Sequence, residues 1–189
     1  MAVLPIAPIG HPVLRTPTRE VSETELASPA IQQLIDDMID TMHDASGAGI
    51  AANQVFAGLR IATIEVTKNP RYPYKPPIPL TVIVNPRWRP LDDETVTINE
   101  GCLSVPLRGD LQRHVTIEVS YLDRDGVAHT ETRLGLTAGT FQHEIDHLDG
   151  RLIVDRIDPA TLATWEQFEA HQREAFVARI TDFVRRVGS

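Results

Sequence analysis

The sequence predicts an α+β fold in which antiparallel β-strands pack around a central metal-binding helix, with an N-terminal helix and a C-terminal helix. Three observations predict it. Apolar residues recur at helical spacing near both ends, segments rich in Ile, Val and Thr occupy the middle, and His-Glu-x-x-His stands at residues 143–147. The chain of 189 residues has the length of one domain, which we expect to cover residues 1–189.

The composition is that of a globular protein with no strong attraction to polyanions. Hydrophobic residues make up 42%, charged residues 23%, and the formal net charge is −8. An acidic chain has no overall attraction to nucleic acid or anionic membranes, so we expect neither DNA nor a membrane as a partner. No stretch approaches the roughly 18 apolar residues of a membrane span, and no basic leader is present, so we expect a cytoplasmic location.

An arm and a helix occupy the first 45 residues. Four prolines within residues 1–20 exclude a regular helix and predict an extended arm across the domain. From Ser28 to about Ala45 the pattern is helical, with one apolar face formed by Ile31, Leu34, Ile35, Met38, Ile39 and Met42. This helix is expected to pack on the core.

Small residues crowd the segment 47–54. Its two glycines and three alanines indicate that something approaches the backbone closely, either another part of the chain or a substrate. Gln54 stands out there as a side chain that both donates and accepts hydrogen bonds. Residues 59–66 then read as a strand rich in Ile, Val and Thr.

A proline-rich loop follows at residues 68–79 and contains Tyr72 and Tyr74. It is too irregular for a helix or strand, and it either covers a site or is a surface loop. We favour the surface loop.

Further strands are predicted by alternating and β-branched residues at positions 80–84, 95–98, 113–122 and 127–134. We expect a turn through Pro106 and Gly109 in the middle of this region. Asp125-Gly126 is expected to form the hairpin turn between the last two strands.

The C-terminal part predicts a short apolar segment at residues 152–157 and then one helix at residues 159–187, because Asp158 is a good N-cap and Pro159 suits the first turn. Its polar middle indicates that its two ends pack differently. Four arginines gather on it, Arg173, Arg179, Arg185 and Arg186. They form either a solvated helix face or a contact with ribosomal RNA.

The His-Glu-x-x-His motif predicts a metal site if its segment is helical. His143 and His147 then lie one turn apart on one face, and Glu144 can take a proton from water on the metal. The alternative is an amphipathic helix with two surface histidines. An apolar side and a glycine stop count against that alternative, through Phe141, Ile145, Leu148 and Gly150.

A catalytic zinc-type site needs about three protein ligands and one open position. Cys102 is the single cysteine, so it cannot form an internal disulfide and its thiol can be a ligand. An inert buried thiol is the common alternative. With His143 and His147 it forms a Cys-His-His set that suits zinc or ferrous iron better than magnesium or calcium.

Three segments together resemble the signature motifs of the peptide deformylases and stand in that family's order. They are Gly47-Ala48-Gly49-Ile50-Ala51-Ala52-Asn53-Gln54, Glu100-Gly101-Cys102-Leu103-Ser104 and Gln142-His143-Glu144-Ile145-Asp146-His147. The resemblance extends outward over most of residues 9–157.

This resemblance implies a metal-dependent hydrolase that removes the formyl group from N-formylmethionyl peptides of newly made proteins. It implies one divalent ion, Fe(2+) or Zn(2+), held by Cys102, His143 and His147. Glu144 would be the general acid/base that works on metal-activated water.

The resemblance also assigns contacts to the peptide. The Gln54 side-chain amide and the Leu103 backbone N–H would stabilise the oxyanion. The substrate backbone would lie along the glycine-rich segment like an extra strand, and further side chains would surround the methionine. The residues implied in substrate binding are Gly47, Gly49, Ile50, Ile98, Arg108, Gly139 and Thr140.

The sequence departs from the family's pattern at two places. Gly139 and Thr140 stand where bulkier side chains are expected, which predicts a wider and more polar methionine pocket. The segment around Arg108 is one residue shorter than usual, which puts in doubt the role of Arg108 at the mouth of the site. Asp146 is expected to pair with Arg113 and brace the metal helix, and solvation of its carboxylate is the alternative.

Two other functions compete with a deformylase. A zinc peptidase would take its third ligand downstream of the motif, from Asp149, Asp155 or Asp158, which leaves Cys102 without a role. The second competing function is a non-catalytic module that recognises peptide N-termini. Glu144 counts against the module, because a binding protein needs no base beside its metal.

Overall fold

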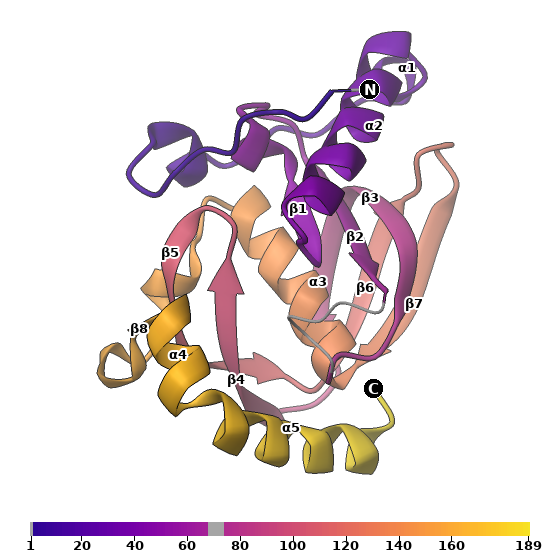
Figure 1. The fold of residues 1–189 in the computed structure, drawn as a ribbon. Helices are drawn as coiled ribbons and strands as arrows, with labels where there is room; N and C mark the ends of the chain where they lie inside the picture. Colours follow the sequence, from indigo (N-terminus) through magenta and orange to yellow (C-terminus); the bar gives the residue numbers. More distant parts are fainter. Residues whose placement is uncertain (1, 68–73) are drawn as a thin grey trace.

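Two antiparallel sheets flank a central helix in the computed structural model, which describes residues 2–67 and 74–189 (Figure 1). The central helix, α3 (Gly135–Leu148), carries the His-Glu-x-x-His motif. The other helices are α1 (Glu23–Leu26), α2 (Pro29–Asp44), α4 (Trp165–His171) and α5 (Arg173–Val187). The predicted α+β arrangement around a metal-motif helix is confirmed.

The sheet on one side of α3 has five strands in the order β1-β2-β3-β6-β7, so β1 is an edge strand. Their bounds are β1 Gly49–Ala51, β2 Ile61–Val66, β3 Ile78–Pro90, β6 Thr116–Leu122 and β7 Ala128–Leu134. The strands expected at residues 59–66, 80–84 and 127–134 are present. The hairpin turn through Asp125-Gly126 is present as well, since Gly126 N–H donates to Asp123 O.

A second sheet of three strands lies on the other side of α3, in the order β4-β5-β8. Its strands are β4 (Thr95–Cys102), β5 (Val105–His114) and β8 (Ala163–Thr164). Cys102 pairs with Val105 across the two-residue turn Leu103-Ser104. Cys102 is therefore the last residue of β4, directly before a tight turn.

The turn expected through Pro106 and Gly109 is wrong, because β5 runs straight through both residues. Pro106 lies where the register of β4 and β5 shifts between Glu100 and Cys102, so its missing N–H interrupts no regular ladder bond. Gly109 allows a close approach instead. A Cβ there would lie 2.6 Å from the Ile157 side chain.

The single strand expected at residues 113–122 is also wrong. β5 ends at His114 and β6 begins at Thr116, and the two strands belong to different sheets. Val115 between them is buried, its N–H donates to Glu94 O, and its carbonyl accepts from Gly135 N–H. A continuous alternating pattern cannot show that the chain crosses from one sheet to another, because both strands keep the same period.

The arm expected at residues 1–20 is described from residue 2, and residues 2–20 contain one short 3-10 helix, Pro12–Arg15, and no other helix. Its backbone contacts two of the three motif segments and the residue that follows the third. Ala7 N–H donates to Gln54 O, Ile9 N–H to Ser104 O and Thr18 N–H to Leu148 O, with N···O distances of 2.8, 2.7 and 2.9 Å. The arm thus ties together the segments that carry the candidate site.

The helix expected from Ser28 to about Ala45 is α2. The Ser28 side chain accepts a hydrogen bond from Ile31 N–H, and Pro29 occupies the first turn. Its apolar face packs on Ile50 and Ile61, in one buried cluster with Ile35, Met38 and Met42.

Helix α3 is buried on nearly all sides, which rules out a surface helix with two exposed histidines. Phe141, Ile145 and Leu148 lie in the cluster under the five-stranded sheet. Gly150, with a φ of +76°, follows the helix in the left-handed conformation that favours glycine. Within residues 2–67 and 74–189, no helix combines the length and the apolar composition that crossing a membrane would need.

The single helix expected at residues 159–187 is divided. Pro159–Thr161 is a 3-10 turn capped by Asp158, and the chain breaks again at Gln172 between α4 and α5. The break lets Phe168 and Phe176 pack against each other with ring centroids 5.9 Å apart. The polar middle seen in the sequence therefore marks a break, because neither helix needs an apolar face there.

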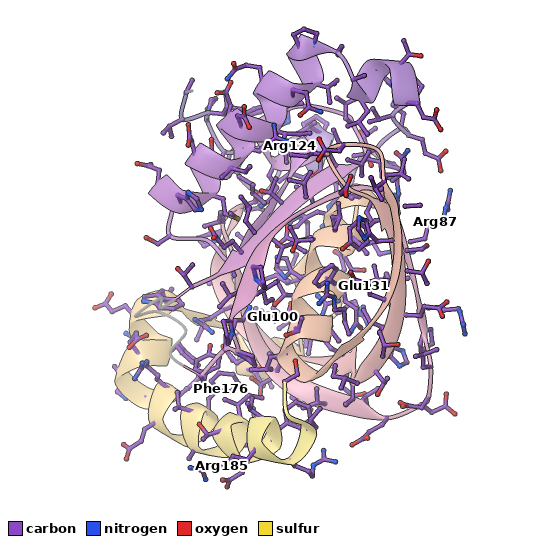
Figure 2. The ribbon with its side chains drawn as sticks, turned by 90° about the vertical axis from the view of Figure 1, so that its right-hand side faces the viewer. Arg87, Glu100, Arg124, Glu131, Phe176 and Arg185 are labelled. Atoms are coloured by element: carbon purple, nitrogen blue, oxygen red, sulfur yellow. The ribbon has the colours of Figure 1, made fainter. Side chains whose placement is uncertain are left out.

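The four C-terminal arginines are held in ion pairs on the surface. They pair as Arg173 with Glu169, Arg179 with Asp110, Arg185 with Asp182 and Arg186 with Glu94. Figure 2 shows Phe176 directed toward the body of the molecule and Arg185 directed away from it.

Candidate active site

The structure brings Cys102, His143 and His147 together from two separate elements. Cys102 ends β4, while the histidines lie one turn apart on α3. One ligand atom from each residue lies within 4.8 Å of the others, and Cys102 Sγ is 3.2 Å from His147 Nε2. Among the described residues this is the group of histidine, cysteine and acidic side chains with the geometry to hold a metal ion. One sulfur and two imidazoles suit zinc or ferrous iron.

The aspartates that a zinc peptidase would use are engaged elsewhere. Asp149 pairs with Arg60, with an Nη1···Oδ1 distance of 2.8 Å. Asp155 pairs with Arg15 and accepts from Leu152 N–H. Asp158 caps the turn that follows it. None of the three belongs to the ligand group around His143 and His147.

Glu100 orients His143, and sequence reasoning did not assign it this role. Its Oε2 lies 2.9 Å from His143 Nδ1, so the other ring nitrogen is the one left to a metal. Figure 2 shows Glu100 in the interior of the molecule. One signal was available: Glu100 precedes Cys102 by two residues, and alternate residues of a strand share a face.

Arg113 joins Glu100 to the metal helix. Its Nε and Nη2 donate to the two carboxylate oxygens of Glu100, at 2.8 and 2.9 Å, and its Nη1 contacts Asp146. Arg113 is 1% exposed. The contact predicted between Arg113 and Asp146 is present.

Charge in this network is set by burial and by pairing. Burial opposes ionisation of Glu100, but Arg113 and His143 outweigh it and hold the pKa of Glu100 well below its usual range. Burial lowers the pKa of His147 well below its ordinary value, so its imidazole is neutral and presents a lone pair. Burial also works to lower the pKa of His143, but the hydrogen bonds with Cys102 and Glu100 outweigh it and raise that pKa above its ordinary value. The groups around the ligand atoms therefore favour a cation.

Glu144 is a buried carboxyl group beside the ligands. Burial raises its pKa to about 7. Its Oε2 is buried and has no hydrogen-bond partner among residues 2–67 and 74–189. A carboxyl group with these properties can hold or release a proton near neutral pH.

Gly49 makes room for Glu144. A Cβ added to Gly49 would overlap the Glu144 carboxyl group, with only 2.6 Å to its Cδ. A Cβ added to Gly47, in the same segment, would lie 2.9 Å from Leu103 Cδ1. The close approach predicted from these glycines is thus made by side chains of the other two motifs.

We expect Gly49→Ala to lower kcat by roughly tenfold to a hundredfold, because the added methyl group displaces the Glu144 carboxyl. Gly58→Ala is the matched control, since a Cβ there meets nothing within 4 Å. Turnover by the metal-loaded protein and thermal unfolding, measured for both variants, check the result. Equal kcat values for the two variants would show that the position of Glu144 does not depend on Gly49.

Gln54 is held with its amide group directed toward Cys102. Its Oε1 accepts from Ala51 N–H at 2.9 Å, and its Nε2 lies 3.0 Å from Ser104 Oγ and 3.7 Å from Cys102 Sγ. The acceptor side is therefore occupied by backbone, and the donor side faces the ligand group. Leu103, in the turn after Cys102, lies against Gly47.

These residues line one cavity of about 520 Å³. Of the residues predicted for substrate binding, it is lined by Gly47, Gly49, Ile98, Arg108, Gly139 and Thr140. Ile50 is not among its lining residues and is fully buried in the cluster under α2. The Ile50 side chain therefore points away from the cavity, because successive residues of β1 face opposite sides and Gly49 takes the side of Glu144.

Arg108 lines the cavity from a buried position and not from an exposed mouth. It is 2% exposed, and its guanidinium stacks on the rings of Trp165 and Phe168, 4.4 and 3.7 Å from their centroids. Its Nε donates to Asn99 Oδ1 at 2.6 Å. Trp165 also lines the cavity, a role that sequence reasoning missed.

The surface loop favoured at residues 68–79 is corrected in part. Residues 68–73, with Tyr72, lie outside the described part of the chain. Tyr74 and Lys75 line the cavity, and Tyr74 packs edge-on against Phe176 with ring centroids 5.1 Å apart. The C-terminal end of this loop therefore belongs to the site.

The pocket at Gly139 and Thr140 is polar but gains no width from Gly139. A Cβ on Gly139 would lie 2.9 Å from Ile98 Cδ1, so the Ile98 side chain occupies that space. Thr140 Oγ1 accepts a hydrogen bond from Lys75 Nζ at 3.1 Å. The expected polarity is present at this end of the cavity.

Comparisons with known proteins agree with the geometry. The model of the family described as polypeptide deformylase matches residues 3–163. The chain is 44% identical over 157 residues to peptide deformylase 2 of Nostoc sp., covering 82% of this chain and 87% of that protein. It is 38% identical over 175 residues to the chloroplastic peptide deformylase 1A of Solanum lycopersicum, covering 87% and 63% of the two chains.

A solved structure gives the same result. The Met-Ala-Ser-bound class I type b peptide deformylase from Acinetobacter baumannii has a TM-score of 0.80 and 40% sequence identity to this chain. The match covers 82% of this chain and 99% of that one.

Proposed function

This chain belongs to the polypeptide deformylase family, whose enzymes remove N-formyl groups from nascent peptides, and from that membership we propose its mechanism and its site residues. The substrate is an N-formylmethionyl peptide, and the products are formate and a peptide with a free α-amino group. One observation carries the proposal. Cys102, His143 and His147 form a ligand group at one cavity, with Glu144 and Gln54 beside it.

Cys102, His143 and His147 hold one divalent ion, Fe(2+) or Zn(2+). When bound, such an ion acts as a Lewis acid that makes water a nucleophile near neutral pH. Glu100 keeps His143 in the required orientation through the bond to Nδ1. Arg113 supports both Glu100 and Asp146, so it connects the strand that ends at Cys102 with the helix that carries the histidines.

Glu144 moves the protons of the reaction. Its carboxylate receives a proton from the attacking water and passes it to the nitrogen that leaves the formyl carbon. Because burial raises its pKa to about 7, the group exchanges a proton readily at neutral pH. Gly49 leaves the space in which this carboxyl group sits.

Gln54 and the Leu103 backbone N–H stabilise the oxyanion that forms on the formyl oxygen. The support for Gln54 is its fixed orientation, with Oε1 on Ala51 N–H and Nε2 toward the ligand group. The peptide backbone adds along β1, which is an edge strand and lines the cavity at Gly49.

We expect Gln54→Ala to lower kcat by roughly a hundredfold to a thousandfold, because one oxyanion donor is lost. Ser104→Ala is the matched control, since it removes a contact of the amide and keeps the amide itself. Metal content should stay at the parent level in both variants. A loss smaller than about tenfold in Gln54→Ala would remove Gln54 from the mechanism.

The function itself is tested with formyl-Met-Ala-Ser. Protein purified without oxygen and supplied with metal should release formate and a free amine, and a chelator should stop the release. Absence of turnover in the metal-loaded protein would favour the binding module instead. Metal analysis of the active protein decides between iron and zinc.

The location and the ribosome contact remain proposals. We propose a cytoplasmic enzyme that acts on nascent chains. The tomato relative is named as chloroplastic, so location differs among similar proteins. Docking on the ribosome through α5 would use arginines that are held in surface ion pairs, and a chain ending near Asp158 should then co-sediment less with ribosomes.

A further inference from the structure

A lysine closes one end of the substrate cavity. Lys75, which precedes β3, donates from Nζ to Thr140 Oγ1 at 3.1 Å, and Thr140 Oγ1 donates to Leu136 O at 3.0 Å. Both Lys75 and Thr140 line the cavity. The neighbouring walls are largely apolar, from Ile98, Leu136 and Tyr74. This end of the cavity therefore combines an apolar wall with a hydrogen-bond donor.

This donor lies one helical turn from the reacting groups. Thr140 and Glu144 are four residues apart on α3, so they share a helix face, as do Gly139 and His143. One turn rises about 5.4 Å. A methionine sulfur is three bonds from its Cα, so a formylated residue with its amide at Glu144 has a side chain long enough to reach Lys75 and Thr140.

The charge around Lys75 favours a neutral acceptor over an anion. Burial lowers the pKa of Lys75, while the carboxylates of Glu100 and Glu144 raise it. An added carboxylate would meet the Glu100 carboxylate, which lines the same cavity as Lys75. A neutral oxygen atom can accept a hydrogen bond from Lys75 without that repulsion.

We propose that Lys75 and Thr140 are specificity residues that let the enzyme accept peptides beginning with N-formylmethionine sulfoxide. This inference rests on the proposed deformylase function. Oxidation of methionine adds one oxygen atom to the sulfur and makes the side chain polar. An apolar pocket rejects that oxygen because it leaves the acceptor without a partner. Here the sulfoxide oxygen accepts from Lys75 Nζ, and the hydrolysis at the formyl group is unchanged.

Three peptides and three proteins test the proposal. The peptides are formyl-Met-Ala-Ser, its sulfoxide, and formyl-norleucyl-Ala-Ser, which has the length of methionine and no acceptor. The proteins are the parent, Lys75→Met and Lys75→Arg. We expect the sulfoxide-to-methionine ratio of kcat/KM to fall about tenfold in Lys75→Met, the effect of losing one hydrogen bond. Lys75→Arg should keep the sulfoxide-to-methionine ratio of the parent. The norleucine-to-methionine ratio of kcat/KM should be the same in Lys75→Met as in the parent.

Calorimetric binding of the product peptides keeps the test independent of turnover. Met-Ala-Ser and its sulfoxide should bind the parent with similar Kd, while Lys75→Met should bind the sulfoxide about tenfold more weakly than the methionine peptide. Equal sulfoxide-to-methionine ratios in the parent and Lys75→Met, in both assays, would overturn the role of Lys75. Failure of the metal-loaded parent to hydrolyse formyl-Met-Ala-Ser would instead overturn the proposed function.

Discussion

Replacing Glu144 by Gln is expected to lower kcat for formyl-peptide hydrolysis by roughly a thousandfold to ten-thousandfold. Glutamine keeps the shape of the side chain but cannot take a proton from water or return it to the leaving amine. Since Glu144 is not one of the three ligand residues, metal content should remain near one ion per chain. Formate release and metal analysis on the same preparation check both statements.

Thermal unfolding shows whether Glu144→Gln loses activity because it misfolds or because it lacks the proton-transferring group. Burial raises the pKa of Glu144 to about 7, above the usual value of about 4.5. A carboxyl group with a raised folded-state pKa costs stability increasingly as pH rises from the unfolded to the folded pKa, and that cost persists above it. In chelator at pH 8, Glu144→Gln should therefore melt at the same temperature as the parent or higher. Turnover within tenfold of the parent would refute the role of Glu144.

Replacing Cys102 by Ser is expected to weaken metal binding by more than roughly a hundredfold and to abolish formyl-peptide hydrolysis. Removing a residue that only supports a metal ligand typically lowers metal affinity about 10- to 100-fold, and removing a ligand should lower it more. Serine offers a hydroxyl oxygen in place of sulfur, and sulfur suits zinc and ferrous iron better. Competition with a chromogenic chelator measures the affinity.

Asp149→Asn is the matched control for Cys102→Ser. In a zinc peptidase, an aspartate downstream of the motif would be the third ligand, and Asp149 is the first of these. Here it pairs with Arg60, and asparagine retains an oxygen that can accept that bond. Metal retained in Asp149→Asn and lost in Cys102→Ser supports the Cys-His-His set. The reverse pattern would support the peptidase.

Local patterns predicted α2, α3 and the hairpin well. The apolar face of α2, its Ser28 cap and the spacing of His143 and His147 depend on neighbours within one or two helical turns. Asp125-Gly126 likewise needs only its own turn geometry. Such features are set by short-range sterics and hydrogen bonds, which the sequence displays directly.

Boundaries that depend on tertiary packing were missed. Val115 separates two strands of different sheets, Pro106 lies within a strand at a register shift, and Gln172 divides two helices. In each case the local pattern is compatible with the wrong element. The correct one forms because burial against a distant segment outweighs propensity.

By itself, the sequence determined the class of fold, the three motif segments and the types of ligand atom, because residue type and short spacing carry that information. Only the tertiary structure decided which face of β1 meets Glu144, that Glu100 holds His143, and that Lys75 reaches Thr140. Lys75 and Thr140 are 65 residues apart, and Glu100 and His143 are 43 apart. Contacts over such separations depend on how sheets and helices pack, and periodicity does not encode that packing.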